Sequence, residues 1–196
     1  MALFAQYRAP QLTLNIAGLM AALLLGLSLP AQADNIQDAN KLLKQGEFVR
    51  AMQKVDDHLA TDPKNPQARF LRGLIFNAQG KSDEALATFR ALTEDYPELP
   101  EPYNNLAVIH ASKGNYDEAI NALKLAIRTN PNYATAHENL GDLYSRMAGQ
   151  SYERAIKLNR ADASAKRKFE LNRELLGNGL PTPLPAASNK APETAP

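Results

Sequence analysis

Apolar residues recur between residues 97 and 131 with the spacing of two amphipathic helices. In each half they recur at steps of three and one, which places them on one face of a helix. The first set is Tyr103, Leu106, Ala107 and His110, and the second is Tyr116, Ala119, Ile120, Leu123 and Ala126. Gly114 lies between the two sets, where a helix end favours glycine in the left-handed region. The pattern therefore predicts two helices joined by a tight turn.

The same unit returns along the chain with a fixed period. Three residue types each occur three times at intervals of 34 residues: Gly46, Gly80 and Gly114; Ala51, Ala85 and Ala119; Pro63, Pro97 and Pro131. A proline at the end of each unit stops the second helix, because the residue before a proline is disfavoured in the helical region. The sequence thus predicts a series of helix–turn–helix units.

A 34-residue helix–turn–helix period is typical of tetratricopeptide repeats, and the chain resembles that family over about residues 34–159. The residues on its signature positions are Tyr103, Leu106, Ala107, Gly114, Tyr116, Ala119, Leu123, Ala126 and Pro131. The resemblance implies an all-α, right-handed α-solenoid. We expect a repeat domain over residues 34–176, with repeats at about 34–65, 66–99 and 100–133.

The fourth repeat, at about 134–159, departs from the period. Its first helix fits, with His137, Leu140 and Tyr144 in place, but the expected glycine and proline are replaced by Ala148 and Ala165. The end of a second helix, including Ala155 and Ile156, arrives five residues early, so the turn has no residues left. We predict one long fused helix over about 134–159; a shortened turn at Gly149 and Gln150 is the alternative.

A capping helix is expected at the end of the array, over about 163–176, with Asp162 as its N-cap. The residues expected on or near its buried side are Ala165, Phe169, Leu171, Asn172, Leu175 and Leu176. The exposed face would carry the basic run Lys166, Arg167 and Lys168, which is the face of a solvated helix or else a site for a polyanion. Residues 177–196 contain five prolines in 20 positions and are predicted to form a disordered Pro/Ala-rich tail.

Residues 1–33 have the features of a secretory signal peptide. Arg8 precedes a 14-residue apolar run, Ile16 to Leu29, which is shorter than a membrane-spanning helix requires. Ala31 and Ala33 provide a cleavage site, so we expect cleavage after Ala33 and a periplasmic or secreted protein. An uncleaved N-terminal anchor is the alternative, and it would be the only membrane attachment.

Composition removes several classes of function. The chain has no cysteine, so neither a thiolate metal site nor a cysteine nucleophile can form. No phosphate loop, nucleophile elbow or His-Glu-x-x-His sequence occurs, and we expect no enzymatic activity, no cofactor and no metal. The formal net charge of +1 and the predicted export argue against nucleic acid as a partner.

The candidate site follows from the resemblance, because in this family the first helix of each repeat lines a concave groove. The 34-residue period places eleven residues there: Phe70, Leu74, Asn77, Glu101, Asn104, Asn105, Val108, Ser112, Glu138, Asn139 and Asp142. Asn105 and Asn139 hold the same repeat position, and related proteins use asparagines there to hold a peptide backbone. A basic clamp for a C-terminal carboxylate is missing, since Ile36, Glu101 and Asn105 occupy its positions.

These observations predict a non-enzymatic scaffold that binds a protein or an extended peptide in its groove, with a role in envelope assembly of a Gram-negative bacterium. The alternative is an accessory module that binds a cell-wall glycan or another non-protein ligand. Aromatic platforms would favour the second function, but Tyr103, Tyr133 and Tyr144 are few and lie at packing positions.

Overall fold

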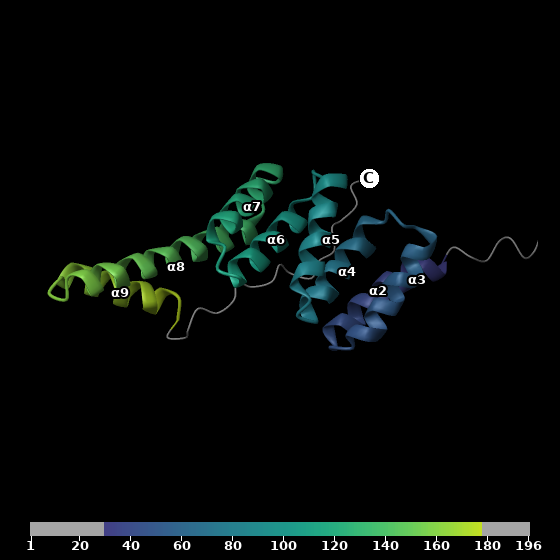
Figure 1. Cartoon of the computed structure of the whole chain (residues 1–196). Coiled ribbons are helices and arrows are strands. Elements are labelled where there is room, and N and C mark those ends of the chain that lie inside the picture. Colours follow the sequence, from purple (N-terminus) through teal and green to yellow (C-terminus); the bar gives the residue numbers. More distant parts are fainter. Residues whose placement is uncertain (1–29, 178–196) are drawn as a thin grey trace, which may run out of the picture. The chain divides into compact units, whose positions relative to one another are not determined.

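The computed structural model describes residues 30–177, in which the chain forms eight helices and no strand (Figure 1). The helices are α2 (Pro30–Lys44), α3 (Phe48–Thr61), α4 (Pro66–Ala78), α5 (Ser82–Asp95), α6 (Pro100–Ser112), α7 (Tyr116–Thr129), α8 (Ala134–Leu158) and α9 (Ala163–Leu175). From Asn35 on, the described helices belong to one compact unit, and apart from the first residues of α2 all that follows concerns this unit. The predicted all-α repeat fold is confirmed.

Glycine makes the turn within each of the first three repeats. Gly46, Gly80 and Gly114 have φ of +77°, +75° and +79°, a region that costs side chains with a Cβ about 1 kcal/mol or more. In each turn the residue after the glycine donates its backbone N–H to a carbonyl near the end of the preceding helix, as Asn115 does to His110 at 2.9 Å. This bond satisfies a carbonyl that the helix leaves open.

Two of the described helices, α4 and α9, begin at a capping side chain. Asn65 accepts a hydrogen bond from the backbone N–H of Ala68 at 2.9 Å, and Pro66 occupies the first helical position. Asp162 caps α9 in the same way, accepting from the N–H of Ala165 at 2.9 Å. The predicted cap at Asp162 is therefore present.

The core runs along the inward faces of successive helices. Ala51, Ala85 and Ala119, the alanines of the 34-residue period, are each 0% exposed. α4 and α5 approach each other closely at Gly73, where an added Cβ would lie 2.6 Å from Cε1 of Phe89. Phe89 also packs against Phe70, with ring centroids 5.5 Å apart. Small residues on one helix thus admit large ones from its partner.

The fourth repeat is fused, as predicted. α8 continues without interruption from Ala134 to Leu158 (Figure 1). Gly149 lies inside this helix. Because the turn residues are missing, the backbone hydrogen bonds of one helix pass directly into the next. α8 packs against α7 at its beginning and against α9 further along.

The expectation for α9 was wrong in part. Leu171 and Leu175 are 59% and 74% exposed, and Ala165 is the one buried residue of the helix. Along α8, all the buried residues (Ala136, Asn139 and Leu143) precede Tyr144. Hence the second half of α8 and α9 form a helix pair with little core of its own.

The N-terminal segment of the first repeat begins earlier than expected, at Pro30 rather than at about Asp34. The predicted signal peptide lies outside the described residues up to position 29, and so does the predicted tail from position 178. Within the described part, none of the helices has the length and apolar character to cross a membrane.

Candidate functional site

Six of the eleven predicted groove residues are buried within the chain itself. They are Phe70, Leu74, Asn104, Asn105, Val108 and Asn139, none more than 7% exposed. A partner cannot contact a side chain that its own fold already covers. For these six residues the structure corrects the prediction that they line an open groove.

The two asparagines proposed to hold a peptide backbone are engaged inside the fold. Asn139 donates from Nδ2 to Oδ1 of Asn104 at 2.8 Å, and both side chains are 0% exposed. Asn105 donates from Nδ2 to the backbone oxygen of Glu101 at 2.9 Å, one turn earlier in α6. The period places Asn105 and Asn139 at the same repeat position. It could not show that both side chains are buried within the fold, where a bound peptide does not reach them.

The apolar members of the set serve the core. Phe70 points between α4 and α5, where it meets Phe89. Leu74, one turn later in α4, is also part of the hydrophobic core. Their apolar character comes from packing within the chain, which the same sequence pattern would produce as readily as a binding surface.

Five predicted residues remain accessible, and all are polar. Asn77, Glu101 and Asp142 are half-buried, while Ser112 and Glu138 are exposed. Glu138 and Asp142 stand four residues apart and so share one face of α8. In the described part of the chain neither carboxylate takes part in an ion pair. Glu101 lies on α6, and the Asn104–Asn139 bond holds α6 beside α8. The surface that these two first helices share is therefore an acidic face, formed by Glu101, Glu138 and Asp142.

Glu101 also shapes the local electrostatics at the start of α8. Burial raises the pKa of Tyr133 to about 12, and the negative charge of Glu101 acts in the same direction. A phenolate next to a carboxylate would be disfavoured, so Tyr133 keeps its proton throughout the physiological range. This hydroxyl adds a neutral polar group close to the acidic face.

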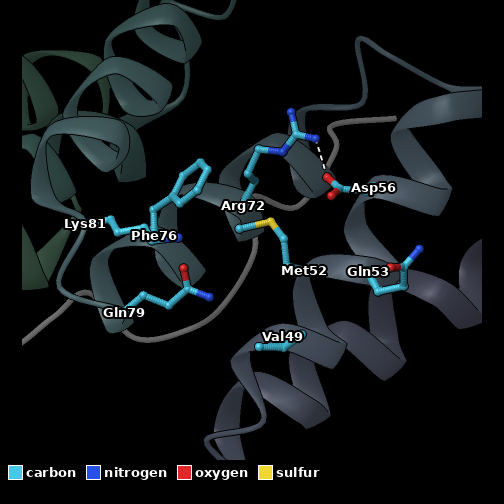
Figure 2. A pocket seen from close by; sticks show the side chains of 8 residues that line it. All are labelled: Val49, Met52, Gln53, Asp56, Arg72, Phe76, Gln79 and Lys81. Carbon is cyan, nitrogen blue, oxygen red and sulfur yellow. Dashed lines mark hydrogen bonds and ion pairs between the residues drawn. The ribbon is translucent and has the colours of Figure 1, made fainter.

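A hollow of about 460 Å³ lies on the surface between α3 and α4 (Figure 2). Its lining combines apolar, amide and charged side chains: Val49, Met52, Gln53, Asp56, Arg72, Phe76, Gln79 and Lys81. Figure 2 shows Arg72 of α4 paired with Asp56 of α3 across the hollow. Nζ of Lys81 lies 5.9 Å from the ring centre of Phe76, a cation–π distance.

The sequence pattern does not reveal this hollow, because its residues come mainly from the second helix of one repeat and the first helix of the next. One signal was available. Val49 stands on the polar side of α3 and is 80% exposed, so it departs from the amphipathic pattern. The charged side chains of the hollow are already paired, Arg72 with Asp56 and Lys81 with the ring of Phe76. The hollow therefore has little capacity to select a ligand by charge.

The histidine and acidic side chains of the described residues do not gather into a metal site. Residues 35–177 contain no cluster of three or more His, Asp or Glu side chains able to hold a metal ion. The three histidines lie apart on different helices: His58 is buried, His110 is half-buried and His137 is exposed, with its Nε2 2.9 Å from the backbone oxygen of Pro131.

Two family models match this sequence. A model described as "Tetratricopeptide repeat" matches residues 37–100, and one described as "TPR repeat" matches residues 109–147. Tetratricopeptide repeat protein 16 from Mus musculus is 28% identical over 160 residues, and the human protein of that name is 25% identical over 158. These alignments cover 73% and 72% of this chain but 21% and 18% of the relatives, so the chain spans about a fifth of their length.

Solved structures give the same fold. A thermophilic TPR protein of Thermus thermophilus superposes with a TM-score of 0.55 at 21% identity, covering 74% of this chain and 83% of that one. The pilF protein of Pseudomonas aeruginosa gives 0.56 at 21% identity, with 74% and 68% covered. The MamA protein gives 0.52 at 23% identity, with 74% and 81% covered. At these identities the similarity concerns the fold alone.

Proposed function

Because this chain belongs to the tetratricopeptide repeat family, whose repeats generally bind protein or peptide partners, we propose that it is a non-enzymatic adaptor that holds an extended segment of a partner protein. The segment lies along the first helices of repeats three and four, α6 and α8. The observation that carries this proposal is the pair of accessible carboxylates, Glu138 and Asp142, which take part in no ion pair among the described residues.

The chemistry of this face selects the partner. Two carboxylates four residues apart on one helix repel each other slightly, and an incoming Lys or Arg side chain would relieve this repulsion. Ser112 and Asn77, at the ends of α6 and α4, add hydroxyl and amide groups that suit a peptide backbone. We therefore expect the partner segment to be basic and its binding to weaken as salt is raised.

Charge reversal on α8 tests the site. Glu138→Lys with Asp142→Lys should fold as the wild type does, because both side chains reach solvent, but should weaken capture of the partner by about tenfold or more. The matched control is Asp57→Lys with Glu94→Lys, which changes the net charge equally on the exposed sides of α3 and α5. The measurement is recovery of partners by the purified chain from the periplasmic fraction, identified by mass spectrometry.

Two results would contradict the site. If the α8 variant and its control recover the same partners in the same amounts, the acidic face does not bind them. If Val49→Asp abolishes recovery instead, the partner occupies the hollow between α3 and α4. Val49 is 80% exposed, so this change should leave the fold intact.

The proposed compartment is the periplasm, with a role in envelope assembly. Its support is the sequence pattern of residues 1–33: a short apolar run followed by small residues at a cleavage site. Intact-mass measurement of the native protein tests it, since cleavage after Ala33 gives a chain that begins at Asp34. A mass that includes Met1 would mean that residues 1–33 are retained and anchor the protein to the membrane.

A further inference from the structure

The end of α8 matches the end of a second repeat helix in structure as well as in sequence. Asn159, which ends α8, has φ −134° and ψ 96°, and Asn130, which ends α7, has φ −135° and ψ 97°. Each asparagine accepts at Oδ1 a hydrogen bond of 3.0 Å from the N–H two residues later. The two turns are the same, 29 residues apart. Ala155 therefore corresponds to Ala126, and Tyr152 to Leu123.

In the complete repeats, a large side chain of the second helix covers a small residue of the first. In repeat two the pair is Phe89 over Gly73, where an added Cβ would lie 2.6 Å from the ring. In repeat three the corresponding positions hold Leu123 and Ala107, both 0% exposed. The register makes Tyr152 and Gly141 the pair of repeat four, an aromatic ring again matched with glycine.

In repeat four this pair cannot form within one chain. Gly141 and Tyr152 lie eleven residues apart on one continuous helix, about 16 Å along its axis at 1.5 Å per residue. Gly141 is exposed, and a Cβ added there would meet no atom within 4 Å. Tyr152 and Ala155 are half-buried, whereas Leu123 and Ala126 are fully covered. Both halves of a repeat interface are thus present. Gly141 is open, and Tyr152 is covered only in part by α9, with Nζ of Lys168 lying 5.9 Å from its ring centre.

The open residues form a stripe on one side of α8. Gly141 is followed by Tyr144, Ala148 and Tyr152, at steps of three and four. Tyr144 is 46% exposed, and it lines a hollow of about 460 Å³ together with Tyr152 and the exposed Leu171 and Leu175 of α9. Three of the five large apolar side chains that are exposed among the described residues therefore border this stripe.

We propose that a second copy of this chain covers the stripe, with the two α8 helices packed antiparallel so that Tyr152 of each copy lies over Gly141 of the other. The two-fold axis passes midway between positions 141 and 152, near residues 146 and 147. Such an interface is self-complementary, as a two-fold symmetric dimer requires. About the same axis Ser145 stands opposite the partner's Ala148, whereas Gly149 is directed toward Asn172 of α9 in its own chain.

The missing turn explains why the contact forms between chains. A shortened connection prevents an element from folding back on its own chain and favours the same contact with a second copy. Each copy would complete the fourth repeat of the other. The apolar surface that the helix pair of α8 and α9 leaves exposed would then be covered, since large exposed patches of this kind mark interaction sites.

The mass of the full chain in solution, measured by light scattering over a range of concentrations, tests the dimer. The wild type should have twice the mass of one chain, and Gly141→Leu should raise the dissociation constant by about tenfold or more, because a leucine fills the notch. The space around Gly141 is open within one chain, so Gly141→Leu should keep its helix content. Gly141→Ala with Tyr152→Leu copies the pair of repeat three and should remain dimeric.

Cysteine cross-linking tests the register. The chain has no cysteine, so single cysteines can be placed without background. An equal mixture of Ser145→Cys and Ala148→Cys chains should form a disulfide-linked dimer on oxidation, since facing positions come within disulfide reach. A mixture of Ser145→Cys with Lys157→Cys is the control and should not yield the mixed disulfide.

Two outcomes would overturn the proposal. One is a wild type that stays monomeric at every concentration, with Gly141→Leu less stable to urea. That result would mean that α8 breaks near Gly149 and closes repeat four within one chain. The other is a dimer whose dissociation constant is unchanged in Gly141→Leu, which would place the interface elsewhere.

Discussion

Asn139 of α8 donates a hydrogen bond of 2.8 Å to Asn104 of α6, and both side chains are completely buried. Each amide keeps one atom without a partner, Nδ2 of Asn104 and Oδ1 of Asn139. The pair therefore joins the first helices of repeats three and four at the cost of two unsatisfied buried atoms. It fixes how α6 and α8 meet, and thus how the acidic face is presented.

Single substitutions of this pair should destabilise the fold. Asn139→Ala leaves the amide of Asn104 buried with no partner, which costs about 1–3 kcal/mol. Asn104→Leu with Asn139→Leu removes all four amide atoms and should cost less than either single alanine change. Urea unfolding followed by circular dichroism measures both. A double leucine variant less stable than each single variant would show that the hydrogen bond outweighs the two unsatisfied atoms.

Overpacking at a helix crossing should also be costly. Ala119 is 0% exposed where α6 and α7 cross, so Ala119→Leu should lower the free energy of unfolding by ~1–3 kcal/mol. Neighbouring repeats share interfaces, and the loss should extend beyond repeat three. Ala60→Leu, on the exposed side of α3, is the control and should leave the unfolding midpoint within error. An unchanged midpoint for Ala119→Leu would place this alanine outside the crossing.

Gly149 should be a weak point of α8. Alanine favours a helix over glycine by about 1 kcal/mol, so Gly149→Ala should raise the free energy of unfolding by up to that amount. The added Cβ would lie 2.7 Å from Oδ1 of Asn172, and this side chain must turn away. The gain should therefore be larger when Asn172→Ala is also present.

The matched control for Gly149 is Gly114, whose φ of +79° disfavours alanine. Gly114→Ala should destabilise the protein, the opposite sign from Gly149→Ala. Thermal unfolding of the two variants compares them directly. Destabilisation by Gly149→Ala in both backgrounds would argue for a turn rather than a helix at that position in solution.

Stability should fall in mild acid because of His110. Burial lowers the pKa of His110 below its ordinary value of 6.5; Glu118 opposes this shift, and Arg90 and Lys113 support it. The unfolded chain therefore binds a proton more readily than the folded chain, and the free energy of unfolding decreases as the pH drops through 6.5 and below. His110→Phe, which copies Phe76 of repeat two, should remove this part of the pH dependence. Urea midpoints from pH 7.5 to 5 measure it, and parallel curves for the two proteins would contradict the assignment.

The sequence by itself determined the fold and most helix boundaries. The 34-residue spacing of Gly46, Gly80 and Gly114 predicts turns, and these turns depend on local backbone preference, which each glycine carries with it. The caps at Asn65 and Asp162 are equally local, since each side chain bonds a backbone N–H three residues away. Even the fused α8 follows from counting, because five missing residues leave no chain for a turn.

The tertiary structure alone decided which surfaces are open. Asn104 and Asn139 are 35 residues apart, and Phe70 meets Phe89 across two helices, so their burial depends on how closely neighbouring helices approach. Gly73 and Gly141 hold the same repeat position, yet one is filled by Phe89 and the other faces open space. A period in the sequence assigns both glycines one role. Whether a ring reaches them depends on the path of the chain, which in repeat four carries Tyr152 away from Gly141 along a single rigid helix.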